Sequence, residues 1–140
     1  MKILLAADGS AFTQKALEFI TARKDALIGG DELLVVNVQP PVPGRVTTML
    51  GSAEVAAYHA EEATKVLTPI QTFLENQAVR HRCVSVVGSA VDEIIFAAKN
   101  EHADIIVMGT HGHGWLGRAV MGSVAQRVVT DSEIPILLVK

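Results

Sequence analysis

The chain has 140 residues, of which 49% are hydrophobic and 19% charged, and its net charge is −3. This length and composition predict one soluble globular domain over residues 1–140. The negative charge and the lack of a basic stripe argue against a nucleic-acid-binding protein. No apolar run approaches the about 20 residues of a membrane span, and we expect no secretory signal. A single cysteine, Cys83, fits a reducing compartment, so the predicted location is the cytoplasm.

Five short apolar runs predict β-strands. Most of them are apolar at successive positions, which is typical of strands covered on both faces. We therefore expect a parallel sheet between two helical layers. The predicted strands are residues 3–7, 33–38, 83–87, 105–108 and 136–139.

The first two predicted helices follow the first two strands. Ser10 is a typical N-cap for the first helix, and the glycine pair at 29–30 is a typical stop. The loop that follows the second strand, residues 39–51, is long, stiffened by prolines and interrupted by glycines. Loops of this length serve as lids or partner-binding segments, or are merely mobile. The second helix spans about residues 52–77, and Pro69 is expected to kink or interrupt it.

The third predicted helix begins at Ser89, whose hydroxyl is expected to cap it, with Asp92 three residues later. A fourth helix is expected over about residues 117–130. Strands and helices therefore alternate throughout the chain. This alternation predicts a doubly wound α/β domain with right-handed crossovers.

A glycine-rich segment follows the fourth predicted strand: Gly109-Thr-His-Gly112-His-Gly-Trp-Leu-Gly-Arg-Ala-Val-Met-Gly122-Ser123. A strand that runs into a glycine-rich loop and then a helix commonly holds a phosphate, because glycines let the backbone approach the anion and N–H groups at the helix start donate to it. Ligands of open parallel sheets bind beyond the carboxyl ends of the strands. If the first and fourth strands are neighbours, Asp8 faces this loop and can accept hydrogen bonds from a ribose or base. Otherwise Asp8 is a turn former or cap.

Other binding motifs fit this segment poorly. Residues 112–117 match the dinucleotide fingerprint Gly-x-Gly-x-x-Gly, but they do not follow the first strand, and no acidic residue ends the next one. The Gly-Lys-Ser/Thr ending of a P-loop is missing. His111 and His113 are too few for a metal site, and we interpret them as loop histidines near the phosphate position. Arg118 either pairs with a phosphate or covers the helix surface.

The spacing Gly-x2-Gly-x9-Gly-Ser is the nucleotide-binding signature of the universal stress protein family, and the chain resembles that family over essentially its whole length. The resemblance extends to Ile3-Leu-Leu-Ala-Ala-Asp8-Gly-Ser10, Leu34-Val-Val-Asn-Val38, Gly88-Ser89-Ala-Val-Asp-Glu-Ile94 and Ile134-Pro-Ile-Leu-Leu-Val139. It implies a three-layer α/β/α sandwich with a five-stranded parallel sheet in the order 3-2-1-4-5. Such a fold is Rossmann-like, of the adenine nucleotide alpha-hydrolase-like type.

Similarity to the ATP-binding branch of the family also implies a set of site residues. Asp8 would lie at the adenosine end, and Val38 would contact adenine, largely through its backbone. The positions that would hold the ribose and phosphates are Gly109, Gly112, Gly122, Ser123 and Val124. The same crevice would be lined by Ala7 and Met108. The implied ligand is ATP or AMP, with Mg²⁺ or Mn²⁺ held through the phosphates.

Three functions remain open from the sequence. The first is a cytoplasmic, homodimeric, nucleotide-binding stress sensor or regulator, since the family commonly dimerises through the last strand, here residues 135–139. The second is a slow ATPase that uses His111 and His113 to position or deprotonate water. The third is a nucleotide-free interaction module that acts on a partner protein through its dimer surface or through residues 40–51.

Overall fold

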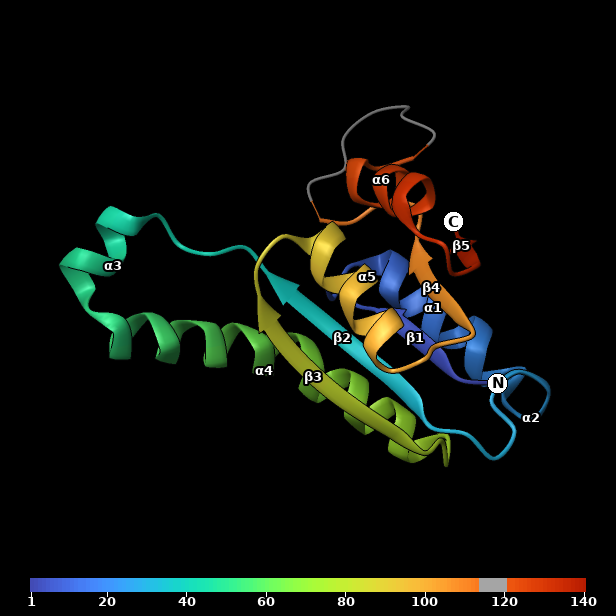
Figure 1. The fold of residues 1–140 in the computed structure, drawn as a ribbon. Helices are drawn as coiled ribbons and strands as arrows, with labels where there is room; N and C mark the ends of the chain where they lie inside the picture. Colours follow the sequence, from blue (N-terminus) through green and yellow to red (C-terminus); the bar gives the residue numbers. More distant parts are fainter. Residues whose placement is uncertain (114–120) are drawn as a thin grey trace.

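Five parallel strands form one sheet in the order β3-β2-β1-β4-β5, as the family resemblance implies (Figure 1). The structure is a computed structural model that describes residues 1–113 and 121–140. The strands are β1 (Ile3–Ala6), β2 (Leu33–Gln39), β3 (His81–Val87), β4 (Ile105–Gly109) and β5 (Ile136–Val139). Each of the five predicted strands is present, with ends that differ by one or two residues.

Strand β1 lies at the centre of the sheet and pairs with β2 on one side and β4 on the other. Leu4 is opposite Leu34 of β2 and Ile106 of β4, so the register is in step across three strands. The first and fourth strands are therefore neighbours, which is the arrangement that Asp8 needs to face the glycine-rich segment.

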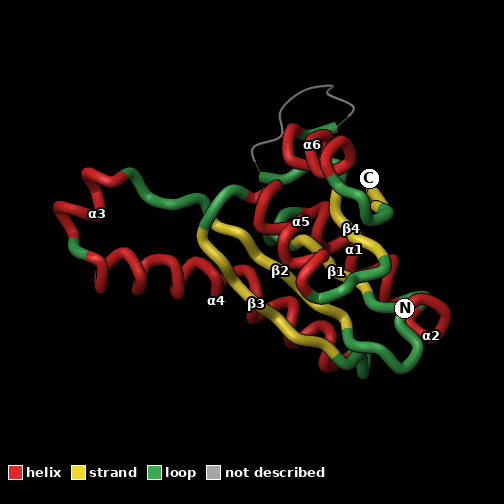
Figure 2. The backbone as a smooth tube through the Cα atoms, viewed as in Figure 1, coloured by secondary structure: helices red, strands yellow, loops and turns green. Residues whose placement is uncertain are grey.

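Helices cover both faces of this sheet (Figures 1 and 2). They are α1 (Ala11–Thr21), α2 (Lys24–Leu27), α3 (Gly44–Leu50), α4 (Ser52–Asn76), α5 (Ala90–Asn100) and α6 (Ser123–Asp131). Buried residues of α1 and α4 pack with one face of the sheet, and those of α5 and α6 pack with the other. In the described part of the chain, no helix is long and apolar enough to cross a membrane.

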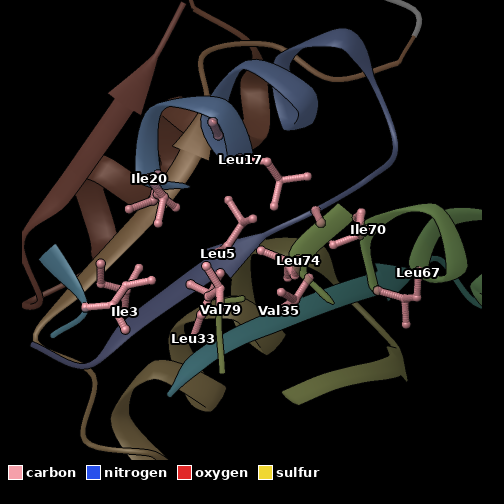
Figure 3. Packing of buried hydrophobic residues seen from close by; sticks show 14 residues of the cluster. Ile3, Leu5, Leu17, Ile20, Leu33, Val35, Leu67, Ile70, Leu74 and Val79 are labelled. Carbon is pink, nitrogen blue, oxygen red and sulfur yellow. The ribbon is translucent and has the colours of Figure 1, made fainter. Parts of the chain in front are cut away.

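The alternation of side chains along the strands divides the core into two clusters. Ile3 and Leu5 belong to the cluster under α1 and α4, while Leu4, between them, belongs to the cluster under α5 and α6. All three side chains are at most 1% exposed. Figure 3 shows the first cluster, in which Leu17 and Ile20 of α1 lie with the strand residues. Apolar burial on both faces explains why the strands are apolar at successive positions.

Helix α1 ends earlier than predicted. Ser10 is its N-cap, and the Ser10 hydroxyl accepts a hydrogen bond from the Thr13 N–H at 3.4 Å, as expected. The helix stops at Thr21, although the expected stop was the glycine pair at 29–30. Arg23 leaves the helical conformation, and its guanidinium donates to the Phe19 carbonyl oxygen at 3.2 Å, which satisfies an acceptor at the helix end. The short helix α2 then completes the connection.

The predicted loop over residues 39–51 contains a helix, α3, that the sequence analysis missed. Pro43 is its N-cap, and the Pro43 carbonyl oxygen accepts hydrogen bonds from the Val46 and Thr47 N–H groups at 2.9 and 3.2 Å. The Thr48 hydroxyl donates to the Gly44 carbonyl oxygen at 3.0 Å. Gly51, with a φ of 85°, ends the helix in the left-handed region that glycine tolerates.

Helix α4 is continuous through Pro69, so of the two expected effects, a kink or an interruption, the interruption is wrong. Proline removes one backbone donor in the helix interior. The Lys65 carbonyl oxygen therefore has no N–H donor at position 69. Lys65 and Pro69 both lie on the exposed side of the helix, where water can replace this hydrogen bond. Leu67, Ile70 and Leu74 lie on the opposite side and are buried against the sheet, which holds the helix on both sides of the proline.

The starts of α5 and α6 also differ from expectation. Ser89 is the N-cap of α5, but its hydroxyl makes no capping hydrogen bond; the acidic Asp92 and Glu93 stabilise this helix start electrostatically instead. Helix α6 begins at Ser123, not near residue 117, with Gly122 as its N-cap. Residues 117–120 of the predicted helix, Arg118 among them, lie outside the described residues, as does Trp115.

Residues 44–57, which we call the arm, extend away from the sheet in Figure 1. They comprise α3 and the first turns of α4, and none of their side chains is buried. Met49 is 83% exposed and Leu50 is 56% exposed. The arm therefore adds little to the stability of the domain.

Replacement of Leu74 by alanine should lower the free energy of unfolding by about 2–5 kcal/mol, because the side chain is 0% exposed and its loss leaves a cavity. The matched change in the arm, Met49→Ala, should alter it by less than about 0.5 kcal/mol. Urea denaturation followed by circular dichroism measures both. Equal effects of the two changes would show that the arm is part of the cooperative core.

Candidate functional site

The order in which the chain adds strands to the sheet reverses between β1 and β4. From β1 the chain proceeds through β2 to β3 on one side, and it then crosses to β4 and β5 on the other. Helices on opposite faces follow the two central strands, so a crevice opens between the loops that leave them. These loops are residues 7–10 and the glycine-rich segment that starts at Gly109.

A cavity of about 920 Å³ occupies this crevice and is large enough for a small organic ligand. It is bounded by the ends of β1, β2 and β4, the first turn of α6, the proline-rich segment 40–43 and one side of α4. All nine residues predicted for the site line it: Ala7, Asp8, Val38, Met108, Gly109, Gly112, Gly122, Ser123 and Val124.

Asp8 is held in one orientation by the start of α1. Its Oδ1 atom accepts hydrogen bonds from the Ser10 N–H and from the Thr13 hydroxyl, both at 2.9 Å. Its own N–H donates to the Thr13 hydroxyl oxygen at 3.1 Å. The second carboxylate oxygen, Oδ2, accepts from the backbone N–H of His113 at 3.3 Å. Asp8 therefore joins the end of β1 to the glycine-rich loop.

The pKa of Asp8 is lower than that of an ordinary aspartate. Partial burial of the carboxyl group raises the pKa, because it disfavours the charged form. The hydrogen bonds from Ser10 and Thr13, together with the nearby His113, outweigh this effect and lower it. Asp8 is consequently ionised at neutral pH and acts as a hydrogen-bond acceptor in the cavity.

Two glycines of the loop occupy positions where a side chain has no room. A Cβ atom at Gly109 would overlap the Cβ of Phe12 in α1, and a Cβ atom at Gly112 would overlap the Oδ2 atom of Asp8. The backbone of the loop can therefore lie against β1 and α1 only with glycine at both positions. The spacing of these glycines reflects close packing between the loop and the Asp8 turn.

The start of α6 completes the other wall of the cavity. The Gly122 N–H donates to the Thr110 carbonyl oxygen at 2.6 Å, which ties the helix start to the end of β4. The N–H groups of residues 123–125 have no acceptor within the helix, as in the first turn of any α-helix, and these residues line the cavity. Backbone donors and the positive end of the helix dipole therefore face it, which favours an anion.

Two polar side chains of β2 shape the opposite end of the cavity. Asn37 is buried, and its amide donates to the Ala7 carbonyl oxygen at 3.0 Å, which ties the end of β1 to β2. The Gln39 amide donates to the His59 carbonyl oxygen at 2.8 Å, and its Oε1 lies 2.8 Å from the His59 Nδ1 atom. This double contact fixes α4 beside the end of β2. Tyr58 and Glu62 of α4 line the cavity next to it.

The described residues contain no group of three or more His, Cys, Asp or Glu side chains that could hold a metal ion. His111 lies beside the Phe12 ring, with 5.3 Å between the ring centroids, and its Nδ1 atom is 3.1 Å from the Thr110 hydroxyl. The Nε2 atom of His113 lies 2.6 Å from the Asp8 carbonyl oxygen. Both imidazoles are thus engaged with neighbouring protein groups.

A model of the universal stress protein family matches residues 1–140. A universal stress protein of Thermus aquaticus is 35% identical over 138 residues, which cover 99% of this chain and 97% of that protein. This chain belongs to the universal stress protein family.

Solved structures of other universal stress proteins have the same fold. The structure of MJ0577 from Methanocaldococcus jannaschii superposes with a TM-score of 0.85 and a sequence identity of 30%. The match covers 99% of this chain and 94% of the MJ0577 chain. A universal stress protein from Archaeoglobus fulgidus in complex with dAMP is 23% identical, with a TM-score of 0.72 and coverage of 100% and 98%. The α/β/α architecture and the strand order of this universal stress protein are therefore those of its family.

Sequence reasoning found Val38 of β2 but missed Asn37, Gln39 and the residues that α4 supplies to this site. Asn37 and Gln39 interrupt an otherwise apolar strand, and buried polar residues in such a run signal a specific hydrogen-bonding role. Their partners, Ala7 and His59, are far away in the sequence and could not be identified from it. Tyr58 and Glu62 carried no signal, because they stand in an ordinary helical pattern.

The lowered pKa of Asp8 predicts an acid-sensitive contribution to stability. The folded state favours the charged carboxylate, so this contribution is complete at neutral pH and is lost as the pH falls below about 4. In Asp8→Asn, the free energy of unfolding should be lower at pH 7 and should decrease less between pH 5 and pH 3. Urea denaturation across this range measures the difference. Asp25→Asn, at an exposed carboxylate of α2, is the control and should retain the slope of the parent.

Proposed function

We propose that this universal stress protein binds an adenine nucleotide, ATP or AMP, in the cavity at the carboxyl ends of β1 and β4. The observation that carries the proposal is the shape of the phosphate end. Gly109 and Gly112 leave no space for side chains, and the first turn of α6 presents backbone donors to the same cavity. In this cradle, Ser123 and Val124 would hold the phosphates through their backbone N–H groups, beside Gly122, whose own N–H donates to the Thr110 carbonyl oxygen.

The opposite end of the cavity suits a nucleoside. Val38 would contact the base, and apolar side chains such as Ala7 and Met108 line the space beside it. The Asp8 Oδ1 atom already has two donors, whereas Oδ2 has one, so a carboxylate lone pair remains for a ribose hydroxyl. The complex of the Archaeoglobus fulgidus relative with dAMP supports an adenine nucleotide as the ligand.

The charges around the cavity favour a metal-bound nucleotide. Among the described lining residues, Asp8 and Glu62 are acidic, and none is lysine or arginine. The phosphates would therefore be recognised by backbone dipoles, and Mg²⁺ or Mn²⁺ held through the phosphates would offset their negative charge. We propose binding and not hydrolysis as the function, because the His113 Nε2 atom is already engaged with the Asp8 carbonyl oxygen.

Calorimetric titration of the parent with ATP and with AMP, in the presence of Mg²⁺, tests the proposal directly. Gly122→Val should weaken binding at least about 10-fold, because a Cβ atom there would lie 3.2 Å from the Thr110 carbonyl oxygen and the side chain would occupy the phosphate cradle. Gly30→Val, at a position with no atoms within 4 Å of the added Cβ, is the matched control and should bind like the parent.

Absence of binding by the parent after removal of copurified nucleotide would contradict the proposed function. Unchanged binding by a folded Gly122→Val variant would contradict the proposed site. Thermal unfolding of each variant shows whether the fold has been retained.

We further propose that the protein is a homodimer, acting in the cytoplasm as a nucleotide-dependent sensor or regulator of the stress response. Strand β5 ends the sheet, and each of its four side chains remains partly exposed in the single chain. An apolar edge strand of this kind is a surface that a second copy can cover. Pairing through β5 would extend the sheet across the two subunits.

The main-chain geometry of β5 allows a specific test of the dimer. The Pro135 carbonyl oxygen accepts a hydrogen bond from Ile106 of β4, and the Val139 carbonyl oxygen accepts one from Thr110, just after β4. The alternate residue Leu138 therefore directs its N–H to the free edge. Leu138→Pro should shift the protein from dimer to monomer, because proline removes this donor. Leu138→Ala loses the same side-chain packing but keeps the N–H, and should remain dimeric. Sedimentation velocity measures both; a monomeric parent would contradict the proposal.

A further inference from the structure

His113 makes two contacts with one residue that is 105 positions away in the sequence. Its backbone N–H donates to the Asp8 Oδ2 atom at 3.3 Å, and its Nε2 atom lies 2.6 Å from the Asp8 carbonyl oxygen. A carbonyl oxygen only accepts, so Nε2 carries the proton in this contact and donates it. One residue of the glycine-rich loop therefore holds both the side chain and the main chain of Asp8.

The Asp8 side of this contact is rigid. Ser10 and Thr13 at the start of α1 fix the Oδ1 atom, and the Asp8 N–H donates to the Thr13 hydroxyl. His113, in contrast, follows two loop positions where glycine is required by close packing. A contact between a fixed turn and a glycine-rich loop restricts the loop, because glycine has the largest conformational freedom to lose.

The surrounding glycines leave room for the imidazole. Gly9 has a φ of 79°, and a Cβ atom there would lie 3.7 Å from the His113 Nε2 atom and 3.3 Å from Val66. A Cβ at Gly112 would overlap the Asp8 Oδ2 atom, the same oxygen that accepts from the His113 N–H. The contact between the His113 N–H and Asp8 Oδ2 thus depends on glycine at position 112, whereas a Cβ at Gly9 would make only ordinary van der Waals contact with the imidazole.

We propose that His113 is a positioning residue that tethers residues 109–113, the first part of the glycine-rich loop, to the Asp8 turn and holds this wall of the cavity in its binding conformation before the ligand arrives. This inference rests on the proposed nucleotide binding. The tether leaves one Oδ2 lone pair unused, so it is compatible with a ribose hydroxyl on Asp8. A loop that is ordered in advance gives a tighter complex, because less conformational entropy is lost on binding.

Replacement of His113 by alanine and by glutamine separates this role from a general structural one. Glutamine places an amide N–H donor the same number of bonds from Cβ as the imidazole Nε2 and should restore the contact, whereas alanine removes it. His113 is exposed, so both variants should fold with the thermal stability of the parent to within a few degrees. Two measurements follow, one without nucleotide and one with it.

In the free protein, amide hydrogen exchange followed by nuclear magnetic resonance should become faster at residues 112 and 113 in His113→Ala and return toward the parent rate in His113→Gln. The pKa of Asp8, from a titration of its carboxyl carbon, should rise in His113→Ala, since His113 helps to lower it. Unchanged exchange rates and an unchanged pKa in the alanine variant would overturn the tether, whatever the protein binds.

With ATP and Mg²⁺, the dissociation constant of His113→Ala should increase about 5- to 10-fold, the loss expected for one hydrogen bond, and His113→Gln should recover most of it. Equal binding by the alanine variant would overturn the positioning role, and tighter binding would overturn it and also show that His113 competes with the ligand. Absence of binding by the parent would contradict the proposed function, while the exchange and pKa measurements would still decide whether the tether exists.

Discussion

The parallel pairing of β1 with β4 is the interaction on which the rest of the site depends. It places the turn after β1 beside the glycine-rich loop after β4, although about a hundred residues separate them. Every wall of the cavity then follows from the neighbours of these two strands, with β2 and α4 on one side and α6 on the other. The pairing is stable because Leu4, Leu5 and their neighbours bury apolar surface on both faces of the sheet.

Asp8 contributes both to the stability of the fold and to the hydrogen-bonding capacity of the cavity. Burial of a carboxylate is unfavourable unless donors replace the lost water, and Ser10, Thr13 and His113 supply them. The same residue is thus a cap for the turn into α1, an anchor for the glycine-rich loop and a remaining acceptor at the cavity wall. The choice of amino acid at position 8 is therefore constrained by both the structural role and the binding role, and more strongly than by either one alone.

Prediction from sequence succeeded where the signal was local or periodic. The successive apolar residues of the strands indicated a sheet covered on both faces. The glycine-rich segment indicated a loop between β4 and the following helix, which lines the cavity. The resemblance to universal stress proteins supplied the strand order. Prediction failed where a contact between distant segments determines the local structure. The sequence around Pro69 does not show that Leu67 and Ile70 pack against the sheet and hold α4 in place. Likewise, nothing local to Gln39 indicates that it holds His59.

The exposed arm has a consequence for how this family can diversify. Residues 44–57 bury no side chain, and Gly51 connects its two helices with no atom within 4 Å of the space a side chain would take. An insertion or deletion at this junction changes few contacts of the sheet or the cavity. Evolution can therefore alter the length and surface of this part independently of the cavity. New segments can be added there while the domain continues to fold.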